Sequence, residues 1–153
     1  MGSITVLVCA LGLLGRSASS MPPIKVLALP PADVSVNAEG FVRGNDGIIY
    51  VVASGVAYHQ ASCDDRRSLL KLASVLVHEE WHIRHGTDER GAYEAQLGTL
   101  LRLGAQPDSF VYTGVVRSMN SVLKAQERAA ANARRDATQE GSMAAAAAPS
   151  PDR

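Results

Sequence analysis

Residues 69–86 read LLKLASVLVHEEWHIRHG and join a strongly apolar helical pattern to a cluster of histidines. Apolar side chains recur at three- and four-residue intervals, which is the spacing of one helix face. We expect a buried helix that begins near Ser62, because a serine hydroxyl can accept a hydrogen bond from the first turn. Gly86 is suited to end this helix as a left-handed cap. The residues of the apolar face are Leu69, Leu72, Ala73, Leu76 and Val77.

The pattern H-E-x-x-H occupies residues 78–82, with His78 and His82 enclosing Glu79. Residues four apart lie about 40° apart around a helix and one turn along it, so two imidazoles can converge on one metal ion. Imidazole nitrogens bind zinc at about 2.0–2.1 Å. Glu79 points about 100° away from His78, which suits it to accept a proton from a water molecule at the metal. The spacing therefore predicts a Zn²⁺ site of the kind that activates water for hydrolysis.

A third protein ligand is needed, because a catalytic zinc usually has three and leaves one position to water. His85 falls on the same helix face, but on a continuous helix it lies about 10.5 Å along the axis from His78, too far for one ion. Acidic side chains follow the turn at Gly86. We expect Glu89 to be the third ligand, because it would lie in the first turn of a returning helix. The remaining candidates are Glu94, Asp88 and His85.

Residues 72–103 resemble the active-site segment of zincin metallopeptidases, in a small single-domain form. The arrangement is similar to the gluzincin type, whose third ligand is a glutamate on the following helix. The step Glu89-x-x-Ala92 is similar to one found in some small members. The resemblance implies that the two histidines and Glu89 bind zinc and that Glu79 is the general base. Tyr93, one turn after Glu89, could donate a hydrogen bond to an oxyanion.

The residues before the helix have the pattern of strands. Residues 24–29 form a short apolar run, and residues 41–52 predict a β-hairpin around the turn Gly44-Asn45-Asp46-Gly47. Residues 48–52 are β-branched or aromatic and predict a strand. The resemblance to zincins implies that this is an edge strand to which an extended peptide can add, and the alternative is a strand that only covers the helix. Two further helices follow Gly86. We therefore predict an α+β domain, in which a small β-hairpin or sheet packs on the helix of residues 78–82, with two further helices.

The two ends of the chain differ from this pattern. Residues 4–14 are almost wholly apolar and precede a small polar stretch, so residues 1–20 have the form of a secretory signal peptide. The run is too short to span a bilayer, which needs roughly 20 residues. Residues 129–153 are rich in alanine and poor in large apolar side chains, which predicts a disordered tail. The zincin-like domain is then residues 22–128.

Charge and cysteine content exclude several classes of protein. Lys plus Arg and Asp plus Glu number 15 each, so no basic surface for nucleic acid is expected. Of the two cysteines, Cys9 would leave with a signal peptide, and Cys63 would then have no intramolecular disulfide partner. We expect a secreted or periplasmic location, the cytoplasm being the alternative, and no stable membrane insertion after signal removal.

Together these features predict a zinc-dependent hydrolase that cleaves peptide bonds of a peptide or protein substrate, with Glu79 as the general base. The main alternative is a non-catalytic zinc-binding or interaction domain that retains a zincin-like site. A hydrolase acting on a non-peptide bond is a further alternative.

Overall fold

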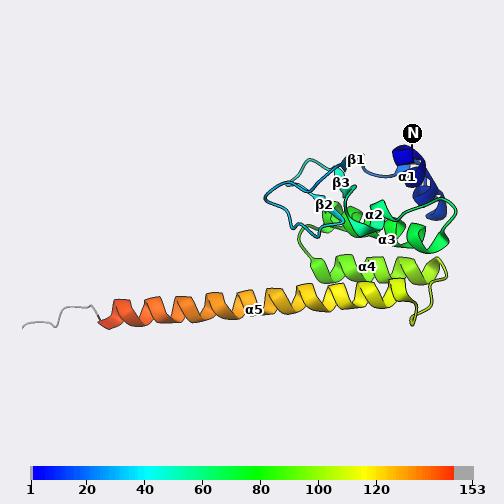
Figure 1. The fold of residues 1–153 in the computed structure, drawn as a ribbon. Coiled ribbons are helices and arrows are strands. Elements are labelled where there is room, and N and C mark those ends of the chain that lie inside the picture. Colours follow the sequence, from blue (N-terminus) through cyan, green and yellow to red (C-terminus); the bar gives the residue numbers. More distant parts are fainter. Residues whose placement is uncertain (1, 147–153) are drawn as a thin grey trace, which may run out of the picture. The chain divides into compact units, whose positions relative to one another are not determined.

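A computed structural model describes residues 2–146, which form a small mixed sheet and a set of helices (Figure 1). The predicted α+β class is confirmed. In chain order the elements are α1 (Gly2–Leu13), the 3₁₀ helix η1 (Ala18–Ser20), β1 (Ile24–Leu27), β2 (Gly40–Val42), β3 (Ile49–Val52), α2 (Val56–His59), α3 (Arg66–His85), α4 (Glu89–Arg102) and α5 (Phe110–Ala146).

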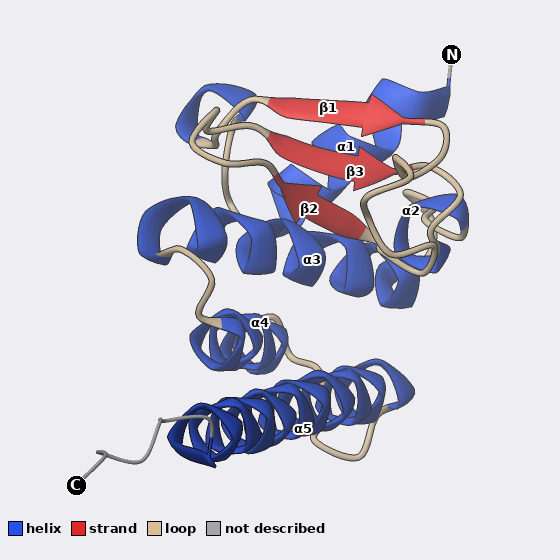
Figure 2. Ribbon diagram, turned by 90° about the vertical axis from the view of Figure 1, so that its left-hand side faces the viewer, coloured by secondary structure: helices blue, strands red, loops and turns tan. Residues whose placement is uncertain are grey.

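The sheet has three strands in the order β1-β3-β2. The predicted hairpin is confirmed, since β2 and β3 are antiparallel with Phe41 opposite Tyr50. Gly44 and Gly47 in the connecting turn adopt positive φ angles of 47° and 66°. However, β3 is the central strand because β1 pairs with its other side in parallel. The expectation of an edge strand at residues 48–52 is therefore wrong, and β2 is the edge strand that runs along α3 (Figure 2).

Helix α3 begins at Arg66, a few residues later than predicted, with Asp65 as its N-cap. The Asp65 carboxylate accepts hydrogen bonds from the backbone N–H groups of Arg67 and Ser68 at 3.0 and 3.3 Å. Ser62 instead begins the turn before the helix, and its carbonyl accepts from the N–H of Asp65 at 3.1 Å. An aspartate satisfies two free N–H groups at once and adds a negative charge where the helix dipole favours it.

Two apolar clusters enclose α3. One contains residues of α1, β3 and α3, with Ile49, Leu72 and Leu76 fully buried. The other lies among α3, α4 and the start of α5 and includes Leu70 and Leu100. Because α3 contributes to both clusters, it is buried on two faces. The polar side chains of His78, Glu79 and Glu80 are therefore buried as well.

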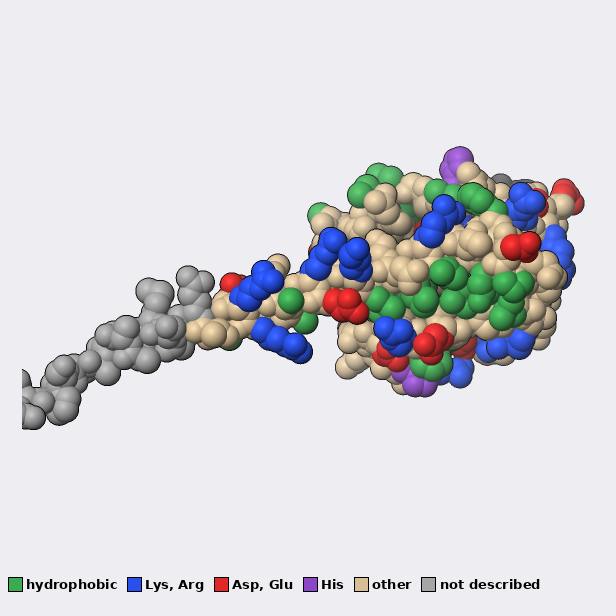
Figure 3. All heavy atoms as spheres, turned by 90° about the horizontal axis from the view of Figure 1, so that it is seen from below, with side chains coloured by type: hydrophobic (Ala, Val, Ile, Leu, Met, Phe, Trp, Pro, Cys, Tyr) green, Lys and Arg blue, Asp and Glu red, His purple; other side chains and the backbone are tan. Residues whose placement is uncertain are grey.

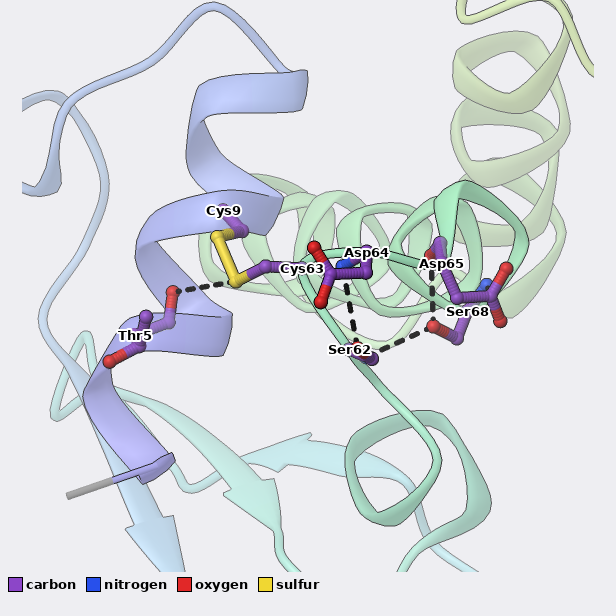
Figure 4. The surroundings of a disulfide bond; sticks show 7 residues. All are labelled: Thr5, Cys9, Ser62, Cys63, Asp64, Asp65 and Ser68. Atoms are coloured by element: carbon purple, nitrogen blue, oxygen red, sulfur yellow. Dashed lines mark hydrogen bonds between the residues drawn. A yellow bond between two sulfur atoms is a disulfide. The ribbon is translucent and has the colours of Figure 1, made fainter.

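Residues 2–13 form helix α1, which packs against α3, and Cys9 and Cys63 form a disulfide with a Cα–Cα distance of 5.7 Å (Figure 4). The expectation that Cys63 is single depends on the removal of residues 1–20, and in the full chain Cys63 is instead paired with Cys9. The apolar run buries Ala10 and Leu11 in the core and so brings Cys9 beside the loop before α3. Disulfides persist in oxidising compartments, and this one is compatible with a secreted location. A signal peptide over residues 1–20 stays a prediction.

The chain divides into two compact units, one ending at Met119 and the other beginning at Asn120. In the second unit helix α5 continues to Ala146, whereas the sequence predicted disorder from residue 129. Alanine has the highest intrinsic helix propensity, which accounts for helix in a segment that has little to bury. The rest of the predicted tail, residues 147–153, lies outside the described residues.

No helix in the described part of the chain is long and apolar enough to cross a bilayer. On the face shown in Figure 3, basic and acidic side chains are interspersed around a group of hydrophobic ones.

Candidate metal centre

A tight turn between α3 and α4 brings the candidate residues together. Gly86 follows the last residue of α3 with a positive φ of 75°, and its N–H donates to the carbonyl of His82 at 2.9 Å. Asp88 is the N-cap of α4, and its carboxylate accepts from the N–H of Gly91 at 3.1 Å. The chain therefore reverses within three residues, and Glu89 is the first residue of α4. Asp88, one of the alternative ligands, serves as a helix cap.

The first turn of α4 approaches α3 closely because Gly91 has no side chain. A Cβ atom at this position would lie 2.7 Å from Cζ2 of Trp81 and 2.3 Å from Oδ2 of Asp88. Both distances are far below van der Waals contact, so any larger residue would push the two helices apart. Trp81 thus acts mainly as a packing surface for α4, and it also stacks on His85 with ring centroids 3.9 Å apart.

Three side chains present ligand atoms to one point. Nε2 of His78 and Nε2 of His82 are 3.1 Å apart, Oε2 of Glu89 lies 3.5 Å from the first nitrogen, and Oε1 of Glu89 lies 3.6 Å from the second. Tetrahedral zinc with bonds of about 2.0–2.1 Å would separate its ligand atoms by about 3.3–3.4 Å. The two nitrogens lie slightly closer than this value, and each nitrogen lies slightly farther than this value from its nearest Glu89 oxygen. His78, His82 and Glu89 could therefore hold a metal ion.

The three groups together stabilise a positive charge. Nδ1 of His82 lies 2.7 Å from the carbonyl oxygen of Gly86, which can only accept, so this nitrogen carries a hydrogen and Nε2 faces Glu89. The Glu89 carboxylate raises the pKa of His82 to about 9. In turn His78 and His82 lower the pKa of Glu89 to about 2. A proton and a metal cation therefore compete for the same two ring nitrogens and the same carboxylate.

Glu79 lies beside this centre in a different environment. Its side chain is buried, with 6% of the residue exposed, and burial raises its pKa to about 7. The backbone of β2 covers it, since a Cβ atom on Gly40 would lie 3.0 Å from Cγ and 3.1 Å from Oε1 of Glu79. A carboxyl group with a pKa near neutrality can both accept and return a proton at physiological pH.

Tyr93 is the neighbouring aromatic residue of the centre. Its ring contacts His78 edge-to-face, with centroids 4.6 Å apart. Burial, together with the nearby carboxylates of Glu89 and Glu79, raises the pKa of Tyr93 to about 12. Its hydroxyl therefore keeps its proton at physiological pH and remains a hydrogen-bond donor.

The other candidates lie away from the metal centre. Glu94 is exposed on α4. His85 is also exposed, and its Nδ1 lies 3.1 Å from the carbonyl of Trp81. Among the described residues that could form a metal-binding group, only one set of three is found, and it contains Glu89 with the two histidines.

Two residues of this centre were not anticipated from the sequence. Gln96 faces His78 across the helix pair, with Oε1 3.1 Å from Nδ1, and its amide nitrogen donates to Ser74 Oγ at 3.1 Å. A signal was present, because Ser74 precedes His78 by four residues and Gln96 follows Glu89 by seven. Both spacings place a residue on the same helix face as a ligand.

Comparisons with known proteins add no relative to this description. No protein-family model, no curated protein and no solved structure matches the chain.

Proposed function

We propose that this protein is a zinc-dependent hydrolase that cleaves peptide bonds. The observation that carries the proposal is the convergence of His78, His82 and Glu89, whose ligand atoms all lie within 4.8 Å of one another. Two imidazoles and a carboxylate also suit Fe²⁺. A buried carboxyl group with a pKa of about 7 beside the centre favours hydrolysis over oxidation chemistry, because hydrolysis needs a general base.

Each residue then has a defined part in the reaction. Zinc, when bound, lowers the pKa of a water molecule towards 7 and polarises a carbonyl group. Glu79 accepts a proton from the attacking water and returns it to the leaving amine. Tyr93 keeps its phenolic proton and can donate a hydrogen bond to the developing oxyanion. Gly40 leaves room for the Glu79 carboxyl group beside the centre, because a side chain at position 40 would collide with that carboxyl group.

The substrate in this proposal is an extended peptide. Strand β2 lies at the edge of the described sheet and its Gly40 contacts Glu79, so a peptide added to this edge would pass beside the general base. Main-chain hydrogen bonds to an edge strand hold a peptide with little preference for its side chains. The Cys9–Cys63 disulfide supports an oxidising compartment as its place of action.

The test compares two adjacent buried glutamates in the full chain. Metal content is measured by mass spectrometry, and cleavage is followed on a mixture of unstructured peptides. Glu79→Gln should keep zinc and lower turnover by about 10²- to 10⁴-fold, the usual contribution of a general base. Glu80→Gln is the matched control, since Glu80 is equally buried but pairs with arginines, and it should keep both zinc and turnover.

The outcomes separate the alternatives. Zinc binding without peptide cleavage in the wild-type protein would identify a metal-binding domain, and cleavage of esters alone would identify another hydrolase. Iron in place of zinc would overturn the proposed chemistry. If His78→Ala or His82→Ala leaves zinc content unchanged, the metal centre is elsewhere.

A further inference from the structure

A chain of buried hydrogen bonds leads away from His78 through α4 and back to α3. Nδ1 of His78 lies 3.1 Å from Oε1 of Gln96, and Nε2 of Gln96 donates to Oγ of Ser74 at 3.1 Å. The Ser74 hydroxyl donates to the carbonyl oxygen of Lys71 at 2.8 Å. Ser74 is 0% and Gln96 is 4% exposed, so water does not compete for these groups. Each group in this series of hydrogen bonds therefore has a fixed partner.

The donor and the acceptor of every hydrogen bond in this series follow from its last member, the carbonyl group of Lys71. The Lys71 carbonyl can only accept, so the Ser74 hydroxyl must use its single hydrogen there. Ser74 Oγ can then only accept from Gln96, which turns the amide nitrogen towards Ser74 and the amide oxygen towards His78. An amide oxygen cannot donate. Nδ1 of His78 must therefore carry the hydrogen, and the neutral ring has its free lone pair on Nε2.

In the neutral form that can bind a metal, the two histidines have the same tautomer, which different partners fix. His82 lies in the last turn of α3, where backbone carbonyls lack helical partners, and its Nδ1 uses the carbonyl of Gly86. His78 lies in the middle of the helix, where the nearby carbonyls already accept helical hydrogen bonds. A side-chain carbonyl from another helix must replace them, and Gln96 supplies it.

We propose that Gln96, oriented by Ser74, is a positioning residue that fixes the tautomer and ring orientation of His78 and thereby sets the metal affinity of the centre. The inference rests on the proposed function, because it assumes that His78 Nε2 is a metal ligand. Groups that hydrogen-bond to a ligating histidine typically contribute 10- to 100-fold to metal affinity or activity. The side chain acts through His78 and touches neither metal nor substrate.

The first measurement is Zn²⁺ affinity of the full chain, by competition with a chelator. Gln96→Leu keeps the approximate volume and removes the acceptor, and it should weaken zinc binding by about 10- to 100-fold. Gln96→Glu keeps an acceptor for Nδ1–H and should bind zinc far more tightly than the leucine variant. Thr99→Val is the matched control, because Thr99 is a buried polar residue three positions along α4 that bonds to Arg102 instead of His78.

The second measurement is the tautomer of His78, read from ¹⁵N NMR of the histidine rings. Wild type and Thr99→Val should show hydrogen on Nδ1, whereas Gln96→Leu should show a mixture of tautomers. Ser74→Ala, a mild change within a helix, should also shift the population, because Gln96 loses the partner that orients it. A structural defect alone would not select one ring nitrogen, so this signal separates positioning from packing.

The outcomes distinguish the inference from the proposed function. If Gln96→Leu and Ser74→Ala keep both the wild-type tautomer and wild-type zinc affinity, the inference is overturned while the metal site stands. If the wild type binds no zinc, the proposed function fails, and the tautomer measured in the metal-free chain still decides whether Gln96 orients His78. Equal weakening by Gln96→Leu and Thr99→Val would show a packing effect and overturn the inference.

Discussion

Glu79 and Glu80 are adjacent on α3 and buried to nearly the same degree, with 6% and 4% of each residue exposed, yet their surroundings are opposite. Glu80 faces the segment after α1, where Arg16 pairs with it, and Arg84 reaches it from the next turn at 2.5 Å. Glu79 faces β2 and the two histidines, and among the described residues no arginine or lysine forms an ion pair with it. The comparison teaches that burial alone does not mark a catalytic carboxylate. A paired carboxylate holds structure together, whereas one without a permanent cation keeps a raised pKa for proton transfer.

The largest effect on stability is expected from the disulfide, which links α1 to the loop before α3. The Cys9–Cys63 bond closes a loop of 54 residues in sequence separation. In the full chain Cys9→Ser should lower the free energy of unfolding by about 4 kcal/mol, because the unfolded state regains the entropy of that loop. Urea unfolding under oxidising conditions measures this change. Zinc binding by the folded variant should persist, since none of the three candidate ligands lies on α1.

The control for this prediction is Cys63→Ser, which should have the same effect. The double variant should add nothing further, because either substitution removes the same bond. Reductant should destabilise the wild type alone. Wild-type stability in Cys9→Ser would show that α1 does not depend on the disulfide.

The next effect concerns the pH dependence that Glu79 imposes on stability. Its pKa rises from 4.5 to about 7 on folding, because burial disfavours the charged form. The folded state then binds more protons than the unfolded state between these values, so stability falls as pH rises through this range. The loss should amount to about 3 kcal/mol above pH 7, since each pKa unit corresponds to about 1.4 kcal/mol. Glu79→Gln should lack this loss.

The measurement is urea unfolding of both proteins from pH 4 to 8 in the presence of a chelator. Near Glu79, His78 and His82 lie on the same helix and Glu89 on α4, and all three are present in both proteins. The difference between the two curves therefore reports the titration of Glu79 together with the effect of its charge on His82. Parallel curves across this range would mean that Glu79 is as well solvated or as well paired as Glu80, and the contrast between the two residues would disappear.

The sequence specifies the elements of the metal centre better than its surroundings. Local periodicity predicts α3 and α4, and the short turn at Gly86 limits which acidic residue can return to the histidines. The structure brings Glu89 to them. The disulfide was missed because its cysteines are 54 positions apart and the docking of α1 depends on tertiary packing. Gln96 and Ser74 were missed for a related reason, since helix spacing gives the face of a residue but not its partner on another helix.

The smallest effect is expected from Glu80 itself. Glu80→Gln should lower the free energy of unfolding by about 2 kcal/mol, because it removes the charge from two charge-assisted hydrogen bonds. The cost stays below that of breaking a wholly buried pair, since the side chains of Arg16 and Arg84 are 35% and 59% exposed and water can solvate them. Arg84→Gln is the matched control and should cost less than about 1 kcal/mol, as an exposed partner does. If the two substitutions lower the free energy of unfolding equally, the burial of Glu80 adds nothing to its ion pairs. The arginines that pair with Glu80 would then not explain the contrast with Glu79.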